Sequence, residues 1–379
     1  LQFQIFPHNQ NYELDLHKPY IDEVVFSCSC GGRYKRISEV FDCWFESGSM
    51  PYAQLHYPFE NKQWFDKNFP ADFIAEGLDQ TRGWFYSLMV LSTALFDEPT
   101  FNNVVVNGMI LAEDGQKMSK RLKNYPDLMY IVEKYGADAL RYYLVSSQAV
   151  RADDLRFSEK GVEEIYKKVI LRIQNVLSFY KLYAKETLIS WKVEPSINVL
   201  DVWILARLSS LAEEVEKRLK DYELDRASRP IFDFLDDLST WYLRRSRERL
   251  KSDDVNERAT ALSTLHNVLN QFSKIIAPFM PFIAEEIYLI VQGSTLNDVR
   301  LSKESVHLES WPFFGEVLDD ETKTKKKIFE EMQIVRTVVS QALDERKKLS
   351  IPVRQPLREL KVKNEELKIK VELLELIRD

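Results

Sequence analysis

Cysteine is scarce in this 379-residue sequence, which contains only Cys28, Cys30 and Cys43. A sparse, odd number of cysteines is typical of a reducing compartment and argues against a disulfide-bonded scaffold. A single residue separates Cys28 from Cys30, whereas zinc-binding cysteine pairs are usually further apart and belong to tetrahedral sets of ligands. The spacing therefore favours a turn with incidental thiols over a structural zinc site, and we expect no protein-bound metal.

Long apolar runs are also missing. The most apolar stretch, residues 275–291, contains two prolines and two glutamates and is shorter than the roughly 20 apolar residues of a membrane span. We therefore predict one buried helix there and no membrane association. The chain shows no charged, apolar and small-residue leader, so we expect a cytoplasmic protein. Because the first residue is Leu1 and not Met, we also expect sequence upstream.

Apolar residues make up 45% of the sequence and charged residues 29%, which is typical of a globular protein and not of a disordered or fibrous one. The length suggests roughly two or three domains. The formal net charge of −7 argues against a nucleic-acid partner, because phosphate binding favours basic surfaces. Net charge averages over the whole chain, however, so local basic segments must be considered separately.

Residues 39–150 combine short apolar runs with helical patterns. Strands are predicted at Asp72–Ala75 and at the β-branched run Val104–Val106, which we expect to be buried, and a helix is predicted at Thr81–Leu95. Strands that alternate with helices are typical of a parallel α/β sheet. The preceding residues are more polar, with a β-type run at 23–26.

After about residue 160 the pattern becomes helical. Apolar residues recur at steps of three and four in the segments 162–180, 204–219, 224–241 and 262–276. Successive amphipathic helices indicate a helical bundle. A further helix is predicted from about 321 to 349, and the prolines of residues 350–356 end it. The last twenty residues alternate apolar with charged residues, so we expect them to begin a further β-containing domain.

A lysine-rich motif follows the second predicted strand: Lys117-Met118-Ser119-Lys120-Arg121, preceded by Asp114-Gly115-Gln116. Two lysines on a mobile loop can surround a polyphosphate and stabilise the charge that develops on leaving pyrophosphate. For an isolated Lys-x-x-Lys, a solvated basic turn is the more frequent explanation. The complete pentapeptide after Asp-Gly shifts the balance towards a phosphate-binding loop.

Two further motifs precede the lysines. Residues 75–85, AEGLDQTRGWF, place Asp79 and Gln80 after a predicted strand, where parallel sheets form their ligand crevice. A carboxylate and an amide there suit ribose hydroxyls, although a helix cap with an exposed acidic turn fits the same residues. Residues 40–51, VFDCWFESGSMP, join aromatic residues to a loop of small residues, which could wall an apolar pocket or belong to the core.

The three motifs, in this order and with these gaps, resemble those of class I aminoacyl-tRNA synthetases, and most of all isoleucyl-tRNA synthetases of the eukaryotic-type branch. The resemblance extends to about residue 358. The strings EGLDQ at 76–80 and RGWF at 82–85 favour the isoleucyl enzymes over the valyl and leucyl relatives. The resemblance implies the second half of a Rossmann-type α/β catalytic domain, followed by an all-α helical-bundle anticodon-binding domain, so that the chain is mainly helical.

The resemblance also implies an activity and its residues. Isoleucine would be activated with ATP to isoleucyl-adenylate and transferred to tRNA(Ile), with Mg²⁺ as the counter-ion of ATP. Lys117 and Lys120 would be catalytic and bind the ATP phosphates. Trp44 and Trp84 would line the isoleucine pocket. The residues implied to bind ATP or the adenylate are Glu76, Gly77, Asp79, Gln80, Asn107, Gly108 and Lys120.

The most basic segment is residues 241–251, in which the arginines are Arg244, Arg245, Arg247 and Arg249. Arginines next to aromatic residues suit phosphate contact and base stacking. A helix whose arginines pair with nearby acidic residues, such as Asp236 and Asp237, fits the sequence equally well. The resemblance implies that these arginines belong to a tRNA-binding bundle.

The resemblance predicts the domain boundaries: 1–38 returns from a missing editing insertion, 39–160 completes the catalytic domain, 161–335 forms the anticodon-binding domain and 336–379 begins a truncated extension. None of the five histidines lies in the His-Ile-Gly-His-type motif that the family carries upstream. We therefore expect this chain to be inactive or nearly so in adenylate formation by itself. We also expect it to be a monomer. A tRNA-binding module without catalysis and an unrelated α/β nucleotide-binding protein remain the alternatives.

Overall fold

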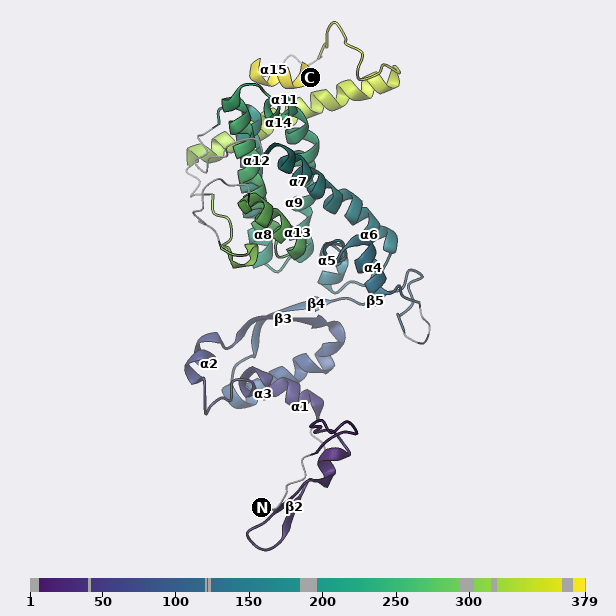
Figure 1. The fold of residues 1–379 in the computed structure, drawn as a ribbon, viewed down its shortest axis with the longest axis vertical. Coiled ribbons are helices and arrows are strands. Elements are labelled where there is room, and N and C mark those ends of the chain that lie inside the picture. The colour runs from purple at the N-terminus through teal and green to yellow at the C-terminus, as the bar shows by residue number, and fades with distance from the viewer. Residues whose placement is uncertain are drawn as a thin grey trace. The chain divides into compact units, whose positions relative to one another are not determined.

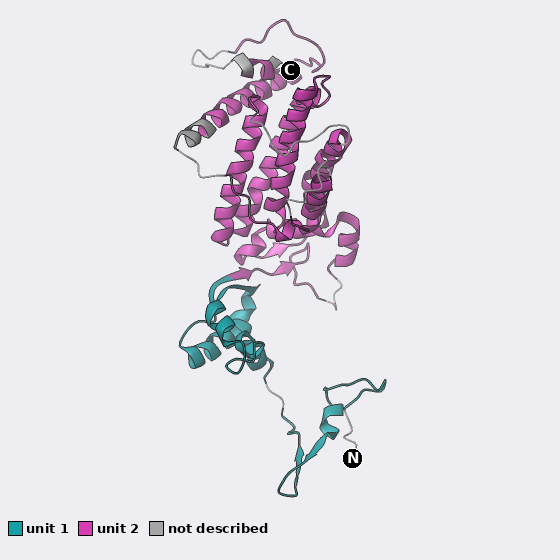
Figure 2. Cartoon of the chain, turned by 60° about the vertical axis from the view of Figure 1, so that its left-hand side comes forward, with its two compact units in different colours: residues 1–104 teal, residues 105–379 magenta. Residues whose placement is uncertain are grey.

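The chain forms two compact units, residues 1–104 and 105–379 (Figures 1 and 2). The structure is a computed structural model that describes residues 7–39, 42–119, 121, 124–184, 196–293, 303–314, 319–362 and 371–378.

The N-terminal unit begins with an antiparallel hairpin of β1 (Val25–Ser27) and β2 (Arg33–Lys35), in which Phe26 lies opposite Tyr34. The β-type run predicted at 23–26 therefore contributes to a strand. All six strand residues are exposed. The turn between the strands contains Gly31, whose φ of +86° lies in the region that glycine adopts without strain.

The rest of this unit contains the helices α1 (Cys43–Ala53), α2 (Lys62–Asn68) and α3 (Trp84–Phe96), the strand β3 (Ala71–Gly77) and the first residues of β4 (Phe101–Asn107), which continues past the boundary at residue 104. β3 and β4 are hydrogen-bonded neighbours, which confirms both predicted strands, and α3 confirms the helix predicted between them. The prediction that the whole run 104–106 is buried is wrong: Val105 is buried, but the side chain of Val104 is 43% exposed. Successive residues of a strand point to opposite faces, and only one face is covered here.

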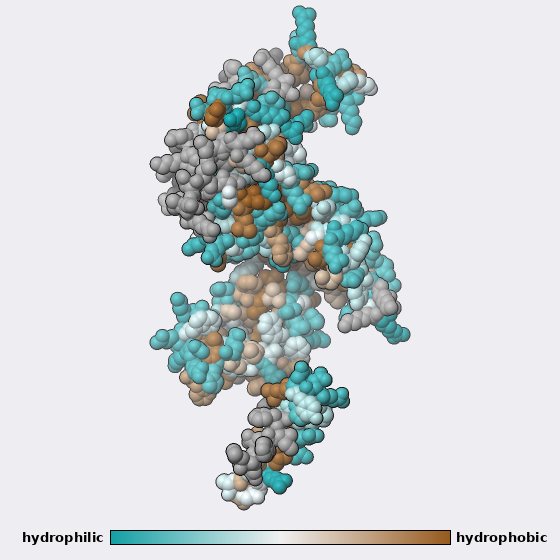
Figure 3. All heavy atoms as spheres, viewed as in Figure 1, coloured by the Kyte–Doolittle hydropathy of each residue, from teal (hydrophilic) through white to brown (hydrophobic). Residues whose placement is uncertain are grey.

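The surface of this unit is mixed. Figure 3 shows hydrophobic residues among hydrophilic ones on its visible face. Exposed apolar side chains include Phe73 of β3 and Val90 of α3. The buried side chains are few, among them Phe65, Phe85 and Leu88, so this unit has a small hydrophobic core.

The second unit starts with a two-stranded parallel sheet of β5 (Ile110–Leu111) and β6 (Leu155–Arg156). The helices α4 (Leu128–Tyr135) and α5 (Ala137–Val145) lie between these strands in the sequence, and α6 (Glu159–Ile165) follows them. A parallel pair needs a long crossover connection, and here it contains helices. The predicted alternation of strands and helices is therefore present, with short strands.

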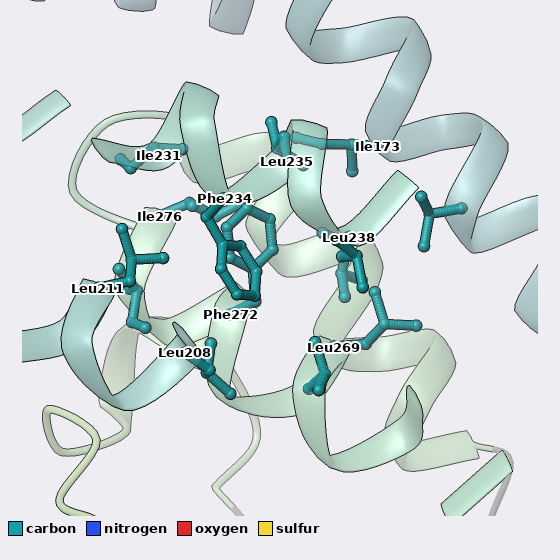
Figure 4. Close-up of a cluster of buried hydrophobic side chains, with 14 of the residues drawn as sticks. Ile173, Leu208, Leu211, Ile231, Phe234, Leu235, Leu238, Leu269, Phe272 and Ile276 are labelled. Atoms are coloured by element: carbon teal, nitrogen blue, oxygen red, sulfur yellow. The ribbon is translucent and has the colours of Figure 1, made fainter. Parts of the chain in front are cut away.

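The helical region contains α7 (Leu171–Ala184), α8 (Val199–Lys220), α9 (Leu224–Asp236), α10 (Leu243–Arg245), α11 (Arg247–Leu250), α12 (Val255–Ile276), α13 (Pro281–Gly293), α14 (Asp319–Lys348) and α15 (Val371–Arg378). The apolar series predicted in the sequence supply its core. Phe234 of α9 packs on Phe272 of α12 with ring centroids 5.3 Å apart, among buried leucines and isoleucines (Figure 4). Truncation of one such buried leucine to alanine typically costs about 2–5 kcal/mol.

Two predictions for the helical region are wrong. Residues 275–291 do not form one helix, because α12 ends at Ile276 and α13 begins at Pro281, a residue without the N–H that the helix interior requires. The last residues do not start a β-structure where they are described: residues 371–378 form α15, because Leu373 and Leu376, three residues apart, are both buried on one helix face. Within the described ranges, no helix is both long and apolar enough to cross a membrane.

Candidate functional site

The structure brings two of the sequence motifs together in the N-terminal unit. The helix α1, from the motif at 40–51, packs against α3, from the motif at 75–85. Gly48 allows this approach, since a Cβ atom at this position would lie 2.9 Å from the Cβ of Ser87. A larger side chain at position 48 would therefore separate the two motifs.

Trp44 and Trp84 lie at this contact. A Cβ atom on Gly83 would lie 3.1 Å from the Trp44 ring, so that ring rests on the backbone immediately before Trp84. The Trp84 indole N–H donates to the Ser47 carbonyl oxygen at 3.4 Å. Trp84 is half-buried and Trp44 is 41% exposed, so each indole is held by the other motif and still has surface available.

Gln80 lies on the short turn Leu78–Arg82 before α3, and its side-chain oxygen accepts the Trp84 backbone N–H at 3.0 Å. This contact satisfies one of the open backbone donors at the start of α3. The helix-cap interpretation of Gln80 is thus present in the structure, and the same bond fixes the position of Trp84.

The remaining predicted residues of this motif lie at the end of β3 and in the turn after it. Gly77 ends the strand, and Glu76 and Asp79 are exposed on either side of it. The end of a strand followed by a turn into a helix is the usual place of a ligand crevice in α/β folds. Both carboxylates are therefore available to hydroxyl donors from solvent or ligand.

The lysine motif lies in the second unit, on a hairpin that Asn124 closes. The backbone of Leu111 forms an antiparallel bridge with that of Lys117, and Gly115 turns the chain with a φ of +84°. The Asn124 side chain donates to the Lys117 carbonyl oxygen at 3.2 Å and accepts the Ser119 backbone N–H at 3.0 Å. Lys117 is exposed, whereas Lys120 lies outside the described residues.

Met118 has a different role from the lysines of its motif. Its side chain is partly buried and packs against the hydrophobic core of the second unit. The loop is therefore anchored through Met118 and Asn124, which leaves the ammonium group of Lys117 in solvent.

Asn107 is the last residue of β4 and Gly108 follows it, and both are partly buried. The Gly108 N–H donates to the Ala149 carbonyl oxygen at 2.8 Å, and a Cβ atom on Gly108 would lie only 2.0 Å from the carbonyl oxygen of Asp153. Glycine is thus required at position 108 by the neighbouring segment. The Asp154 side chain, which sequence reasoning missed, accepts the next backbone N–H, from Met109, at 3.0 Å.

The predicted basic segment divides into two groups. Arg244 and Arg247 are exposed, and the guanidinium of Arg245 stacks on the Trp241 ring, 4.2 Å from its centroid. Arg249 is different: its side chain is 13% exposed and donates to both carboxylate oxygens of Asp201, at 2.9 and 2.8 Å. The donors of Arg249 are therefore directed into the helical region.

The acidic residues upstream of the basic segment have other partners. Asp236 pairs with Arg172 at 3.1 Å, and Asp237 pairs with Arg207 at 2.7 Å and with Arg336. Several of these residues line a cleft of about 750 Å³ between α8, α9 and α14. Sequence reasoning missed these pairs because the partners lie 30 to 99 residues apart in the chain.

Two family models match the chain. Residues 7–157 match the model described as tRNA synthetases class I (I, L, M and V), and residues 201–362 match the model described as the anticodon-binding domain of tRNA ligase. Together they account for most of the described residues.

Curated relatives give the same result. The isoleucine–tRNA ligase of Protochlamydia amoebophila is 49% identical over 348 residues, and that of Chlamydia trachomatis serovar A is 50% identical over 347 residues. These matches cover 90% and 91% of this chain but only 32% of each relative. The chain thus spans about a third of the length of the relatives that it matches.

Solved structures agree on the fold. A LeuRS of Agrobacterium radiobacter K84, in a ternary complex with tRNA and LeuAMS, matches with a TM-score of 0.59 at 19% identity, over 77% of this chain and 35% of that chain. A Mycobacterium tuberculosis methionyl-tRNA synthetase with methionyl-adenylate matches with a TM-score of 0.50 at 23% identity, over 62% of this chain and 47% of that chain. On its motifs, family models and relatives, the chain belongs to the class I tRNA synthetases, and within them to the isoleucine–tRNA ligase family.

Proposed function

We propose that the full-length protein activates isoleucine with ATP and transfers the isoleucyl group to tRNA(Ile), and that this chain supplies the second part of the catalytic domain and the anticodon-binding domain. The observation that carries the proposal is the identity of about half of the residues with isoleucine–tRNA ligases over 90% of the chain. Residues 39–160 and 161–335 are the proposed extents of these domains.

In the proposed activation step, the carboxylate of isoleucine attacks the α-phosphate of ATP, and pyrophosphate leaves. No covalent enzyme intermediate is needed, so the protein contributes orientation and stabilisation of charge. Lys117 and Lys120 are the proposed cations for the departing phosphates, together with Mg²⁺ that enters with ATP. The anchored hairpin supports this assignment, because it holds the backbone while Lys117 remains in solvent.

The adenylate is assigned to residues at the ends of β3 and β4 and in the turns after them. Glu76, Gly77, Asp79 and Gln80 would bind its ribose, and Asn107 and Gly108 would lie near its adenine. The exposed carboxylates of Glu76 and Asp79 suit ribose hydroxyl donors. Trp44 and Trp84 would line the isoleucine pocket, where the half-exposed indoles offer apolar surface. Isoleucine and valine differ by one methylene, and discrimination between them by this class of enzyme is the standard example of a case in which binding alone is insufficient. We therefore expect the full-length protein to edit wrongly activated valine.

In the tRNA-binding part, Arg244, Arg245 and Arg247 are the proposed phosphate and base contacts. Two of them are exposed, and the third already stacks on an aromatic ring. Arg249 contributes through the fold, since its buried pair with Asp201 positions the same segment. We further propose that the protein is cytoplasmic and that it is a monomer.

The test is isoleucine-dependent exchange between ATP and pyrophosphate, measured on the full-length protein. Lys120→Ala should reduce the exchange rate by about 100-fold or more, because one preorganised charge contact is worth a few kcal/mol in the transition state. Lys67→Ala, which removes an exposed lysine at the end of α2, serves as the control. An unchanged rate in the Lys120 variant would remove the catalytic assignment.

The same assay separates the alternatives. A wild-type protein that binds tRNA but supports no exchange would be a tRNA-binding module without catalysis. Exchange that depends on valine or leucine, and not on isoleucine, would identify a valyl or leucyl relative.

A further inference from the structure

Arg156, the last residue of β6, lies in one row with Lys117. Leu111 of β5 is paired with Arg156 on one side and with Lys117 on the other. Residues paired directly across neighbouring strands point to the same face of a sheet. The Cα atoms of Arg156 and Lys117 are therefore two strand spacings apart, roughly 10 Å, and their side chains share a face.

The other face of these strands packs on the hydrophobic core of the second unit. Met118 packs against the core directly after Lys117. Phe157 is buried directly after Arg156. Successive residues of a strand alternate between the two faces, so both cationic side chains point away from the core, and both are exposed.

The backbone next to Arg156 is fixed on both sides. The Phe157 N–H donates to the Leu111 carbonyl oxygen at 2.9 Å. The Tyr143 hydroxyl donates to the Arg156 carbonyl oxygen at 3.5 Å and accepts the Ser158 N–H at 3.3 Å. The starting point of the Arg156 side chain is thus held by β5 and by α5.

The guanidinium of Arg156 reaches the turn of the lysine hairpin. A Cβ atom on Gly115 would lie 3.0 Å from its Nε and 3.2 Å from its Nη2. The carboxylate of Asp114 turns back into the hairpin, where it accepts the Gln116 N–H at 2.9 Å. Among the described residues, Arg156 has no ion-pair partner, so its donors are available to an anion.

From this arrangement we propose that Arg156 binds the same polyphosphate as Lys117: the triphosphate of ATP and, after activation, pyrophosphate. This assignment rests on the proposed function and adds a residue to its phosphate site. A guanidinium presents a planar fork of donors that binds phosphate oxygens in pairs, whereas an ammonium acts as a point charge. Arg156 stays protonated and stabilises the charge that develops as the P–O bond to pyrophosphate breaks.

The first test is the binding of magnesium pyrophosphate to the full-length protein, measured by isothermal titration calorimetry. Arg156→Ala should raise the Kd by roughly tenfold or more, because charge-assisted hydrogen bonds are lost. Arg156→Lys should restore part of the affinity, since the charge remains and the fork does not. Lys160→Ala, which removes an exposed lysine of α6, is the matched control. Equal affinities of the wild type and Arg156→Ala would overturn the proposal.

A non-hydrolysable analogue of isoleucyl-adenylate tests whether the effect is confined to the phosphates. The analogue has no β- or γ-phosphate, so Arg156→Ala should bind it within about twofold of the wild type. The KM for ATP in the exchange assay should rise together with the Kd for pyrophosphate. An equal loss of affinity for the analogue would overturn the proposal, because it would show general damage to the site.

An unchanged KM for ATP combined with weaker binding of tRNA would also overturn it, since the arginine would then contact the tRNA backbone. The proposed function is tested separately by the wild type. If the wild type supports no isoleucine-dependent exchange, the proposed activity fails, while the pyrophosphate titration still decides whether Arg156 binds the polyphosphate.

Discussion

The carboxylate of Asp138, in α5, accepts the backbone N–H of Ile283 at 2.7 Å at the start of α13. The same carboxylate accepts the Phe282 N–H at 3.4 Å, and Asp138 is buried. The first N–H groups of a helix have no partner within it. A residue 145 positions away therefore supplies the cap that joins α5 to the helical region.

We expect Asp138→Ala to lower the free energy of unfolding of the second unit by about 1–3 kcal/mol, because two buried backbone donors lose their acceptor. Asp138→Asn keeps one acceptor oxygen and should have a smaller effect. Urea denaturation measures both, with Glu133→Ala on the exposed face of α4 as the control. A loss no larger than that of the control would show that the cap contributes little.

The buried Arg249 and the exposed Arg244 and Arg247 should have different effects on stability when each is replaced by alanine. Arg249→Ala leaves the buried Asp201 without its ion-pair partner and should cost about 3–5 kcal/mol of stability. Arg244→Ala and Arg247→Ala should change stability by less than about 0.5 kcal/mol, since both side chains are exposed.

For the exposed pair, the proposed role predicts weaker binding of tRNA instead. Each variant should reduce the slope of log affinity against log salt by about 1, as expected when one phosphate contact is lost. Filter binding over a range of salt concentrations measures the slope. An unchanged slope in the double variant would remove these arginines from the interface.

The proposed place of Trp84 in the isoleucine pocket predicts that its removal weakens the binding of isoleucine. Trp84→Ala should raise the KM for isoleucine in the exchange assay by roughly tenfold or more, because loss of a large apolar contact costs about 1–3 kcal/mol. Trp84→Phe should keep part of the affinity. If only tRNA affinity changes, the pocket has been placed wrongly.

The buried side chain of His266 should make the stability of the protein depend on pH. Burial lowers the pKa of His266 to about 4, and its ring nitrogen Nδ1 is hydrogen-bonded to the Tyr180 hydroxyl at 2.8 Å. The unfolded chain binds a proton at the ordinary histidine pKa of about 6.5, whereas the folded one does not. The free energy of unfolding should therefore fall between pH 6.5 and 4, by at most about 1.4 kcal/mol per pH unit for this group, and should not depend on it above this range.

His266→Gln should flatten this part of the curve, and His307→Gln, at an exposed position, serves as the control. Urea denaturation at a series of pH values gives the comparison. Parallel curves for the wild type and the His266 variant would contradict the prediction.

Much of the molecule was predictable from local sequence patterns. The apolar spacing of 204–219 and 262–276 predicted helices that became α8 and α12, since a helix repeats its face every three or four residues. The β-branched run at 104–106 predicted a strand for the same local reason. The motifs at 40–51, 75–85 and 117–121 predicted the family, because family motifs are properties of the sequence itself.

The tertiary structure alone decided which residues face inward and which distant groups meet. The sequence grouped Arg249 with the neighbouring arginines, but its ion-pair partner, Asp201, lies 48 residues away in the chain. Nothing local in the sequence indicates that Val104 is exposed, or that Asp138 caps a helix far along the chain. Backbone periodicity is set by neighbours in the chain, whereas burial and the pairing of charges depend on which elements pack together, and that is determined only when the whole unit folds.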